Sequence, residues 1–123
     1  MGIGRKKVDF KIKMSISSDT LEAWIELKHW LIGYQKGKKY NARSYFIDSS
    51  SVGIKPDAEK LSRIPSDNKF LLILTTANPG VKDWTIGIDK FNKKFQPLYL
   101  ESLTNPVEFP NFYFIGLLKI SKR

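Results

Sequence analysis

Cysteine is absent from the 123 residues, and histidine occurs only once, as His29. Without thiols, the chain forms neither a disulfide framework nor a thiolate zinc site. Long hydrophobic runs are missing too: none reaches the roughly 20 residues that a transmembrane helix needs. The segment MGIGRKKVDF lacks the apolar core of a signal peptide. We therefore expect a cytoplasmic protein with no membrane partner.

Acidic residues are scarce relative to basic ones. The chain has 21 Lys and Arg against 12 Asp and Glu, a net charge of +9. In a small domain this surplus favours a polyanion partner, nucleic acid before an anionic membrane surface, although it can also serve solubility alone. The length fits one domain spanning residues 1–123, with 41% apolar residues to build its core.

Two opening segments predict a β-hairpin. Residues 8–16 alternate strictly between apolar and polar side chains, residues 17–20 are turn formers, and residues 21–32 read as the second strand. The other expected elements are a basic loop at 33–40, a short strand at 45–47, a helix at 55–64, a buried strand at 69–77, a helix at 83–95, a partly irregular stretch at 96–110 and a strand at 111–123.

The hairpin brings three ionisable side chains together. Matching the apolar faces pairs Ile16 with Leu21 and places Asp9 opposite Lys28; a register shifted by two places Asp9 opposite Glu26. In either register Asp9, Glu26 and Lys28 share one face. The odd-numbered residues from 21 to 27 then face the core, and His29 points to that side in a structural role.

Two neighbouring carboxylates repel each other unless a positive charge lies between them. Mg²⁺ or Mn²⁺ takes oxygen ligands and often needs only one or two protein carboxylates. A lysine beside such an ion can orient water and stabilise charge developing on a phosphate. Asp9, Glu26 and Lys28 therefore suit phosphodiester hydrolysis. Asp48, Asp57 and Glu59 are further carboxylates, the latter two explained by the first turn of the helix.

The segments KKVDFKI and WIELKHW, followed by the helix DAEKLSRI and the strand KFLLILTT, resemble the PD-(D/E)XK nuclease superfamily over about the first two-thirds of the chain. The resemblance implies a metal-dependent endonuclease acting on DNA, with RNA open, in restriction, repair or recombination. It implies Asp9 and Glu26 as metal ligands and Lys28 as the catalytic lysine. The implied fold is α/β, a mixed central sheet with flanking helices and a restriction-endonuclease-like core.

The family usually has a helix and a strand before the motif aspartate, and only eight residues precede Asp9 here. We expect a core that lacks the usual N-terminal helix. Either a partner subunit supplies the missing layer, which makes a homodimer a further expectation, or the chain is a minimal or decayed member of the family.

Basic residues flank the proposed site on both sides. They can contact phosphates on either side of a scissile bond, and interleaved tyrosines can stack on unpaired bases. The alternative is a solvated loop. The predicted nucleic-acid-binding residues are Arg5, Lys6, Lys7, Lys36, Lys38, Lys39 and Arg43.

Three other interpretations stay open. Asp9, Glu26 and Lys28 can form cross-strand ion pairs on a solvated sheet face. The chain can be a non-catalytic nucleic-acid-binding or assembly module derived from a nuclease fold. It can also be a protein-interaction domain whose contact is made by Trp24 and Trp30.

Overall fold

The computed structural model describes residues 10–16, 19–30, 34–35, 38–39, 42–47, 53–106 and 113–123, with side chains for 22–30, 45–47, 53–106 and 113–123. Its elements are β1 (Phe10–Ile16), β2 (Asp19–Trp30), β3 (Tyr34–Gln35), β4 (Lys38–Lys39), α1 (Ala42–Ile47), α2 (Lys55–Ser62), β5 (Lys69–Thr75), α3 (Gly80–Lys94), β6 (Leu98–Ser102) and β7 (Ile115–Lys122). The predicted α/β class is confirmed.

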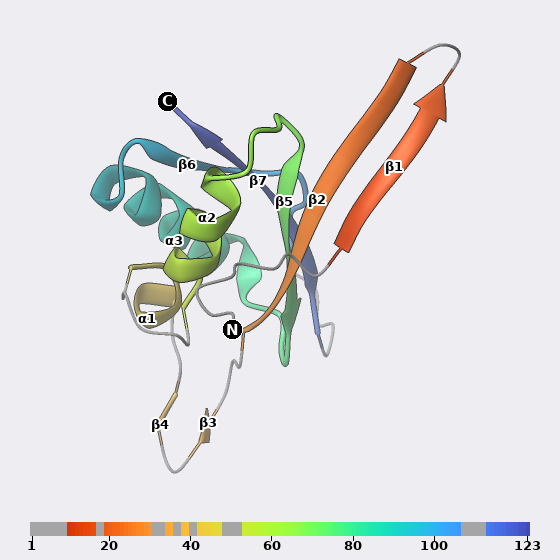
Figure 1. Ribbon diagram of the computed structural model, residues 1–123. Helices are drawn as coiled ribbons and strands as arrows, with labels where there is room; N and C mark the ends of the chain where they lie inside the picture. Colours follow the sequence, from red (N-terminus) through yellow and green to blue (C-terminus); the bar gives the residue numbers. More distant parts are fainter. Residues whose placement is uncertain are drawn as a thin grey trace, which may run out of the picture.

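A five-stranded mixed sheet forms the centre of the molecule, in the order β1-β2-β5-β7-β6. β2 runs parallel to β5, and the other neighbouring strands are antiparallel. The helices gather on one side of the sheet, and the β1–β2 hairpin extends away from them (Figure 1). β5 is the middle strand, as its apolar run predicts.

The hairpin adopts the second of the two predicted registers. Phe10 lies opposite Ile25 and Met14 opposite Leu21, whereas Ile16 lies opposite Asp19 and not Leu21. This is the register shifted by two, for which the sequence predicts Asp9 opposite Glu26. Asp9 itself lies outside the described residues.

The core lies on the even-numbered face of β2, and the sequence predicts it on the odd-numbered face. Trp30 is 2% exposed, and it packs with Leu71 and Ile73 of β5 beneath the helices. On the other face Leu27 is 36% exposed and Leu74 37% exposed. The prediction that the odd-numbered face is the core face was therefore wrong. The helices cover the even-numbered face despite its charges because α2 brings charges of opposite sign to it.

Residues 45–47 form the end of helix α1 and not the predicted strand. Tyr45 and Phe46 are adjacent in the chain and both are buried, at 3% and 0% exposure. In a strand, adjacent side chains point to opposite faces, whereas on a helix two neighbours can reach one core. Tyr45 stacks on Trp30 at 4.7 Å between ring centroids, and Phe46 packs edge-on against Trp84 of α3.

Both predicted longer helices are present. α2 has Pro56 in its first turn, where the missing N–H costs nothing. α3 includes Gly87, where an added Cβ would lie 2.2 Å from the ring of Phe46, so glycine permits the close approach of α3 to α1. The stretch predicted as partly irregular contains β6, whose Leu98 and Leu100 alternate into the core.

Candidate functional site

Glu26 and Lys28 lie on the covered face of β2, as their spacing of two predicts. In the parallel pairing, Glu26 is level with Leu71 and Lys28 with Ile73, so both charged side chains leave the sheet at its buried centre. Helix α2 lies across this face (Figure 1). The charged pair therefore faces a helix and not solvent.

Two ion pairs join β2 to α2. Lys60 Nζ donates to Glu26 Oε2 at 2.8 Å, and Lys28 Nζ lies 3.0 Å from Asp57 Oδ2. The spacing explains why both form: two residues along a strand span roughly 6.6 Å, and three residues along a helix rise about 4.5 Å on one side. We call Glu26, Lys28, Asp57 and Lys60 the β2–α2 charge cluster.

The β2–α2 charge cluster has two negative and two positive groups in a partly buried place. The Glu26 side chain is 9% exposed and that of Lys60 18%; Lys28 and Asp57 are 19% and 18% exposed. Charges at this depth lose hydration, and removing one member would leave its partner poorly compensated. The cluster is neutral in sum and still reachable from solvent.

Glu26 and Lys28 lie beside each other on one face of β2, as the alternation of the strand predicts. Asp57 was attributed to the first turn of its helix, and it also pairs with Lys28. Lys60 was missed, although a lysine three residues after Asp57 on a helix following β2 is a usable signal. Glu59, another weighed carboxylate, pairs instead with Lys55 at 2.9 Å. Asp48 lies outside the described residues.

The fit of a metal ion rests on Glu26. Its carboxylate offers the oxygen ligands that Mg²⁺ prefers, and the face is partly shielded from water. The ammonium of Lys60 holds the position on Oε2 that a cation would take. Within the described ranges, no three carboxylate, histidine or cysteine side chains come together as a ready metal site. Asp9, which the sequence predicts as the second ligand, lies outside the described residues.

Two polar atoms near this region are buried without a hydrogen-bond partner in the described part of the chain: Trp30 Nε1 and the hydroxyl of Tyr45. Burial raises the pKa of the Tyr45 phenol well above its usual value, and the negative charge of Asp57 raises it further. The phenol therefore remains protonated and neutral beside the Lys28–Asp57 pair.

His29 is exposed on the open face of the sheet. Its side chain points to the face of β2 opposite to that of Lys28, as alternation predicts. That face is not the core side, so the expectation that His29 faces the core was wrong. The histidine takes no part in the β2–α2 charge cluster.

The predicted phosphate-binding residues lie mostly outside what the structure describes. Arg5, Lys6, Lys7 and Lys36 are outside the described residues. Lys38 and Lys39 belong to β4, and Arg43 belongs to α1, with backbone positions only. Contact of these residues with nucleic acid stays a prediction.

None of the helices that the structure describes is long and apolar enough to cross a membrane. No family model matches the chain, and no curated protein or solved structure is significantly similar to it.

Proposed function

We propose that this chain is a metal-dependent endonuclease that hydrolyses phosphodiester bonds of DNA at the β2–α2 charge cluster. One observation carries the proposal: Glu26 and Lys28 meet on one partly buried face, where α2 adds Asp57. The basic surplus of +9 supports a polyanionic substrate. DNA as the partner, a restriction-endonuclease-like core, a homodimer and a cytoplasmic location belong to the same proposal.

Each residue of the cluster has a role that its contacts suggest. Glu26, together with Asp9, would hold Mg²⁺ or Mn²⁺, which when bound polarises a phosphate and activates water. Lys28 orients the attacking water and offsets the negative charge that develops on the phosphate. Asp57 holds the Lys28 ammonium in place at 3.0 Å. Lys60 neutralises Glu26 in the resting protein and would compete with a metal for Oε2.

Conservative substitutions in the cluster test the proposal. We expect Glu26→Gln and Lys28→Met each to reduce Mg²⁺-dependent cleavage of plasmid and oligonucleotide DNA at least a hundredfold, because each removes a charge and keeps the side-chain length. Retained DNA binding and an unchanged circular dichroism spectrum would show that the loss is chemical. Reactions with EDTA, which removes the divalent metal ions, measure the metal-independent background cleavage.

Matched controls lie on the same sheet. Glu101→Gln changes an exposed carboxylate of β6, and Lys119→Met changes a lysine of β7 opposite it. Both control variants should cleave like the wild type. Wild-type cleavage by Glu26→Gln and Lys28→Met would remove the assignment.

A second function is favoured by the ion pairs themselves. Both carboxylates of the cluster are neutralised by lysines at 2.8 Å and 3.0 Å, so the cluster is balanced without a metal. In a non-catalytic nucleic-acid-binding module, these ion pairs would serve only to hold α2 against β2. It predicts salt-sensitive DNA binding and no metal-dependent product from the wild-type protein.

A further inference from the structure

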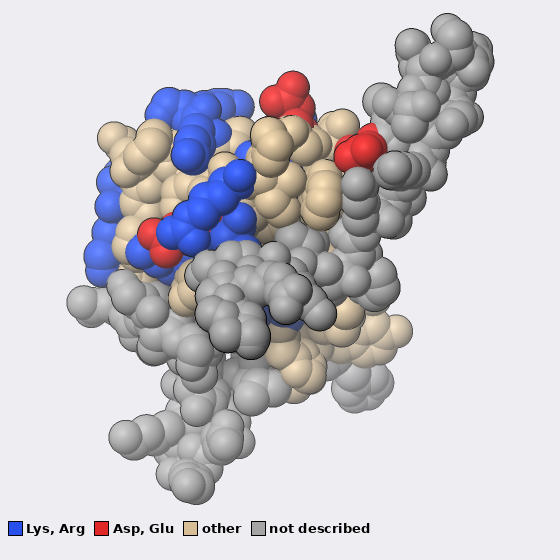
Figure 2. Space-filling view, in the orientation of Figure 1, with Lys and Arg blue, Asp and Glu red and all other residues tan. Residues whose placement is uncertain are grey.

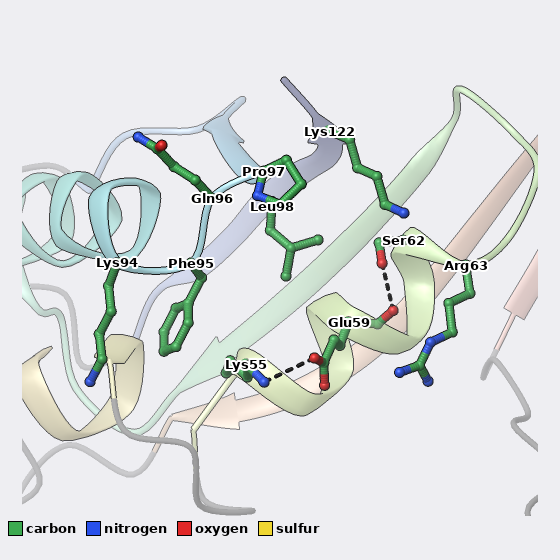
Figure 3. Close-up of a pocket in the computed structure, with 10 residues that line it drawn as sticks. All are labelled: Lys55, Glu59, Ser62, Arg63, Lys94, Phe95, Gln96, Pro97, Leu98 and Lys122. Carbon is green, nitrogen blue, oxygen red and sulfur yellow. Dashed lines mark hydrogen bonds and ion pairs between the residues drawn. The ribbon is translucent and has the colours of Figure 1, made fainter.

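A second group of basic side chains surrounds a hollow beside α2 (Figure 3). The hollow has a volume of about 410 Å³ and lies between α2, the end of α3, the following turn and the end of β7. Lys55, Arg63, Lys94 and Lys122 line it, and we call it the basic hollow. Lysines and arginines gather over this part of the surface (Figure 2).

Positive charge exceeds negative charge in the basic hollow. Glu59 is the acidic residue among its lining side chains, and it pairs with Lys55 at 2.9 Å. Lys94 donates to the backbone carbonyl of Ile47 at 2.9 Å. Arg63 and Lys122 are exposed and form no ion pair within the residues that the structure describes. The hollow therefore offers cations that no carboxylate among the described residues neutralises.

The pKa of buried Lys69 is affected by the same excess of positive charge. Its ammonium donates to the carbonyls of Ile64 and Ser62, at 3.1 Å and 3.4 Å, near the C-terminal end of α2. Loss of hydration lowers the pKa of Lys69, and the positive charge of Lys122 lowers it further, against an opposing effect of Asp67. Lys69 does not line the hollow, but Lys122, which does, repels its ammonium, and an anion bound beside Lys122 would relieve this repulsion.

Half-buried Phe95 forms an apolar part of the hollow. The ammonium groups of Lys55 and Lys94 lie 5.6 Å and 5.4 Å from its ring centroid. These cation–π contacts orient the two lysines before a ligand arrives. Because two ammonium groups already lie over the Phe95 ring, a base that stacked on it would have to displace at least one of them. The cations of the hollow therefore suit phosphate groups, and its aromatic ring is not available for stacking on the face of a base while both ammonium groups lie over it.

The hollow and the β2–α2 charge cluster share one helix. Asp57 and Lys60 turn toward β2, whereas Lys55, Glu59 and Ser62 turn toward the hollow. A helix with its side chains is about 10–12 Å across, so a strand bound at one site can reach the other.

We propose that the basic hollow binds the phosphate backbone of the nucleic-acid strand whose cleavage is assigned to the β2–α2 charge cluster. The identity of the ligand rests on the proposed function. Binding itself needs no metal and no hydrolysis, because it depends on Arg63 and Lys122 and not on Glu26. The hollow is thus a binding site distinct from the residues predicted near the N-terminus and in the loop at 33–40.

Charge reversal at two exposed positions tests this site. Arg63→Glu/Lys122→Glu should bind a fluorescent single-stranded 20-mer and its duplex at least tenfold more weakly in EDTA, by anisotropy. The plot of the logarithm of the binding constant against the logarithm of the salt concentration should become less steep, its negative slope shrinking in magnitude by about 2, because two phosphate contacts are lost. Circular dichroism should confirm an unchanged fold.

The matched control changes net charge equally. Lys82→Glu/Lys90→Glu alters two exposed lysines of α3 that do not line the hollow. This variant should bind within threefold of the wild type. Equal losses in both double variants, or no loss in the hollow variant, would overturn the site. Cleavage assays of Glu26→Gln decide the proposed function separately, so either proposal can fail without the other.

Discussion

Two charged regions lie on either side of α2 and differ in balance. In the β2–α2 charge cluster, each carboxylate has a lysine within 3.0 Å, and the side chains are at most 19% exposed. In the basic hollow, Arg63 and Lys122 are exposed without an ion-pair partner among the described residues. One region is internally neutral, and the other keeps a positive surplus.

This difference in charge balance indicates how each region would bind a charged ligand. A balanced, partly dehydrated cluster must exchange an existing ion pair before it binds a cation. An unbalanced, hydrated group of cations attracts an anion at once and loses that attraction in salt. This difference supports the strand binding that we propose for the hollow, whereas the chemistry proposed for the cluster rests on the meeting of Glu26 and Lys28 on one face and not on its charge balance.

The comparison can first be tested by removing one lysine from each region. Lys60→Met should lower the free energy of unfolding by about 2 kcal/mol, because it takes a partner from a carboxylate in a residue only 7% exposed. Lys55→Met breaks a pair whose side chains are 23% and 40% exposed, so it should cost less than about 0.5 kcal/mol. Urea denaturation measures both; equal losses would contradict the distinction.

A smaller effect should follow when Mg²⁺ is added to Lys60→Met. With the ammonium gone, Lys60 no longer competes for Oε2 of Glu26, and Mg²⁺ at about ten times its dissociation constant should restore roughly 1.4 kcal/mol. The wild type should gain less, because Lys60 competes for Oε2. NaCl at equal ionic strength and the double variant Glu26→Gln/Lys60→Met are controls. The same gain in that double variant would show that the metal binds elsewhere.

The smallest effect concerns the pKa of Lys69, which burial lowers most and Lys122 lowers further. A lowered lysine pKa disfavours the charged form in the folded state. The folded protein therefore gains stability as pH rises from the folded pKa of Lys69 to the unfolded value near about 10.4. Lys122→Gln should raise the Lys69 pKa and narrow this window. Titration of the Lys69 side chain by NMR measures it, with Lys90→Gln as control; an unchanged pKa would contradict the repulsion.

Local patterns in the sequence predicted most of the elements. Strict alternation predicted the β1–β2 hairpin, and an apolar run predicted β5. Pro56 correctly indicated the start of α2. Helix α1 was missed because its aromatic residues suit a strand by propensity, and only packing against Trp30 and Trp84 decides otherwise.

The site was predictable to the extent that it depends on one strand. Alternation alone places Glu26 beside Lys28. The core face was predicted wrongly because Glu26 and Lys28 suggest a solvent-exposed face. Their partners, Asp57 and Lys60, come from α2, which is distant in the sequence. The basic hollow could not be predicted from the sequence. Its cations come from α2, the end of α3 and β7, and only the fold brings these segments together.

The most direct test of this account compares binding and Mg²⁺-dependent cleavage of one labelled DNA by Glu26→Gln and Arg63→Glu/Lys122→Glu. Glu26→Gln should bind like the wild type in EDTA and leave the DNA intact after Mg²⁺ is added. The double variant should bind at least tenfold more weakly, and it should regain cleavage when protein is raised to saturate the DNA. Normal cleavage by Glu26→Gln, or cleavage by the double variant that saturation fails to restore, would contradict the division of roles across α2.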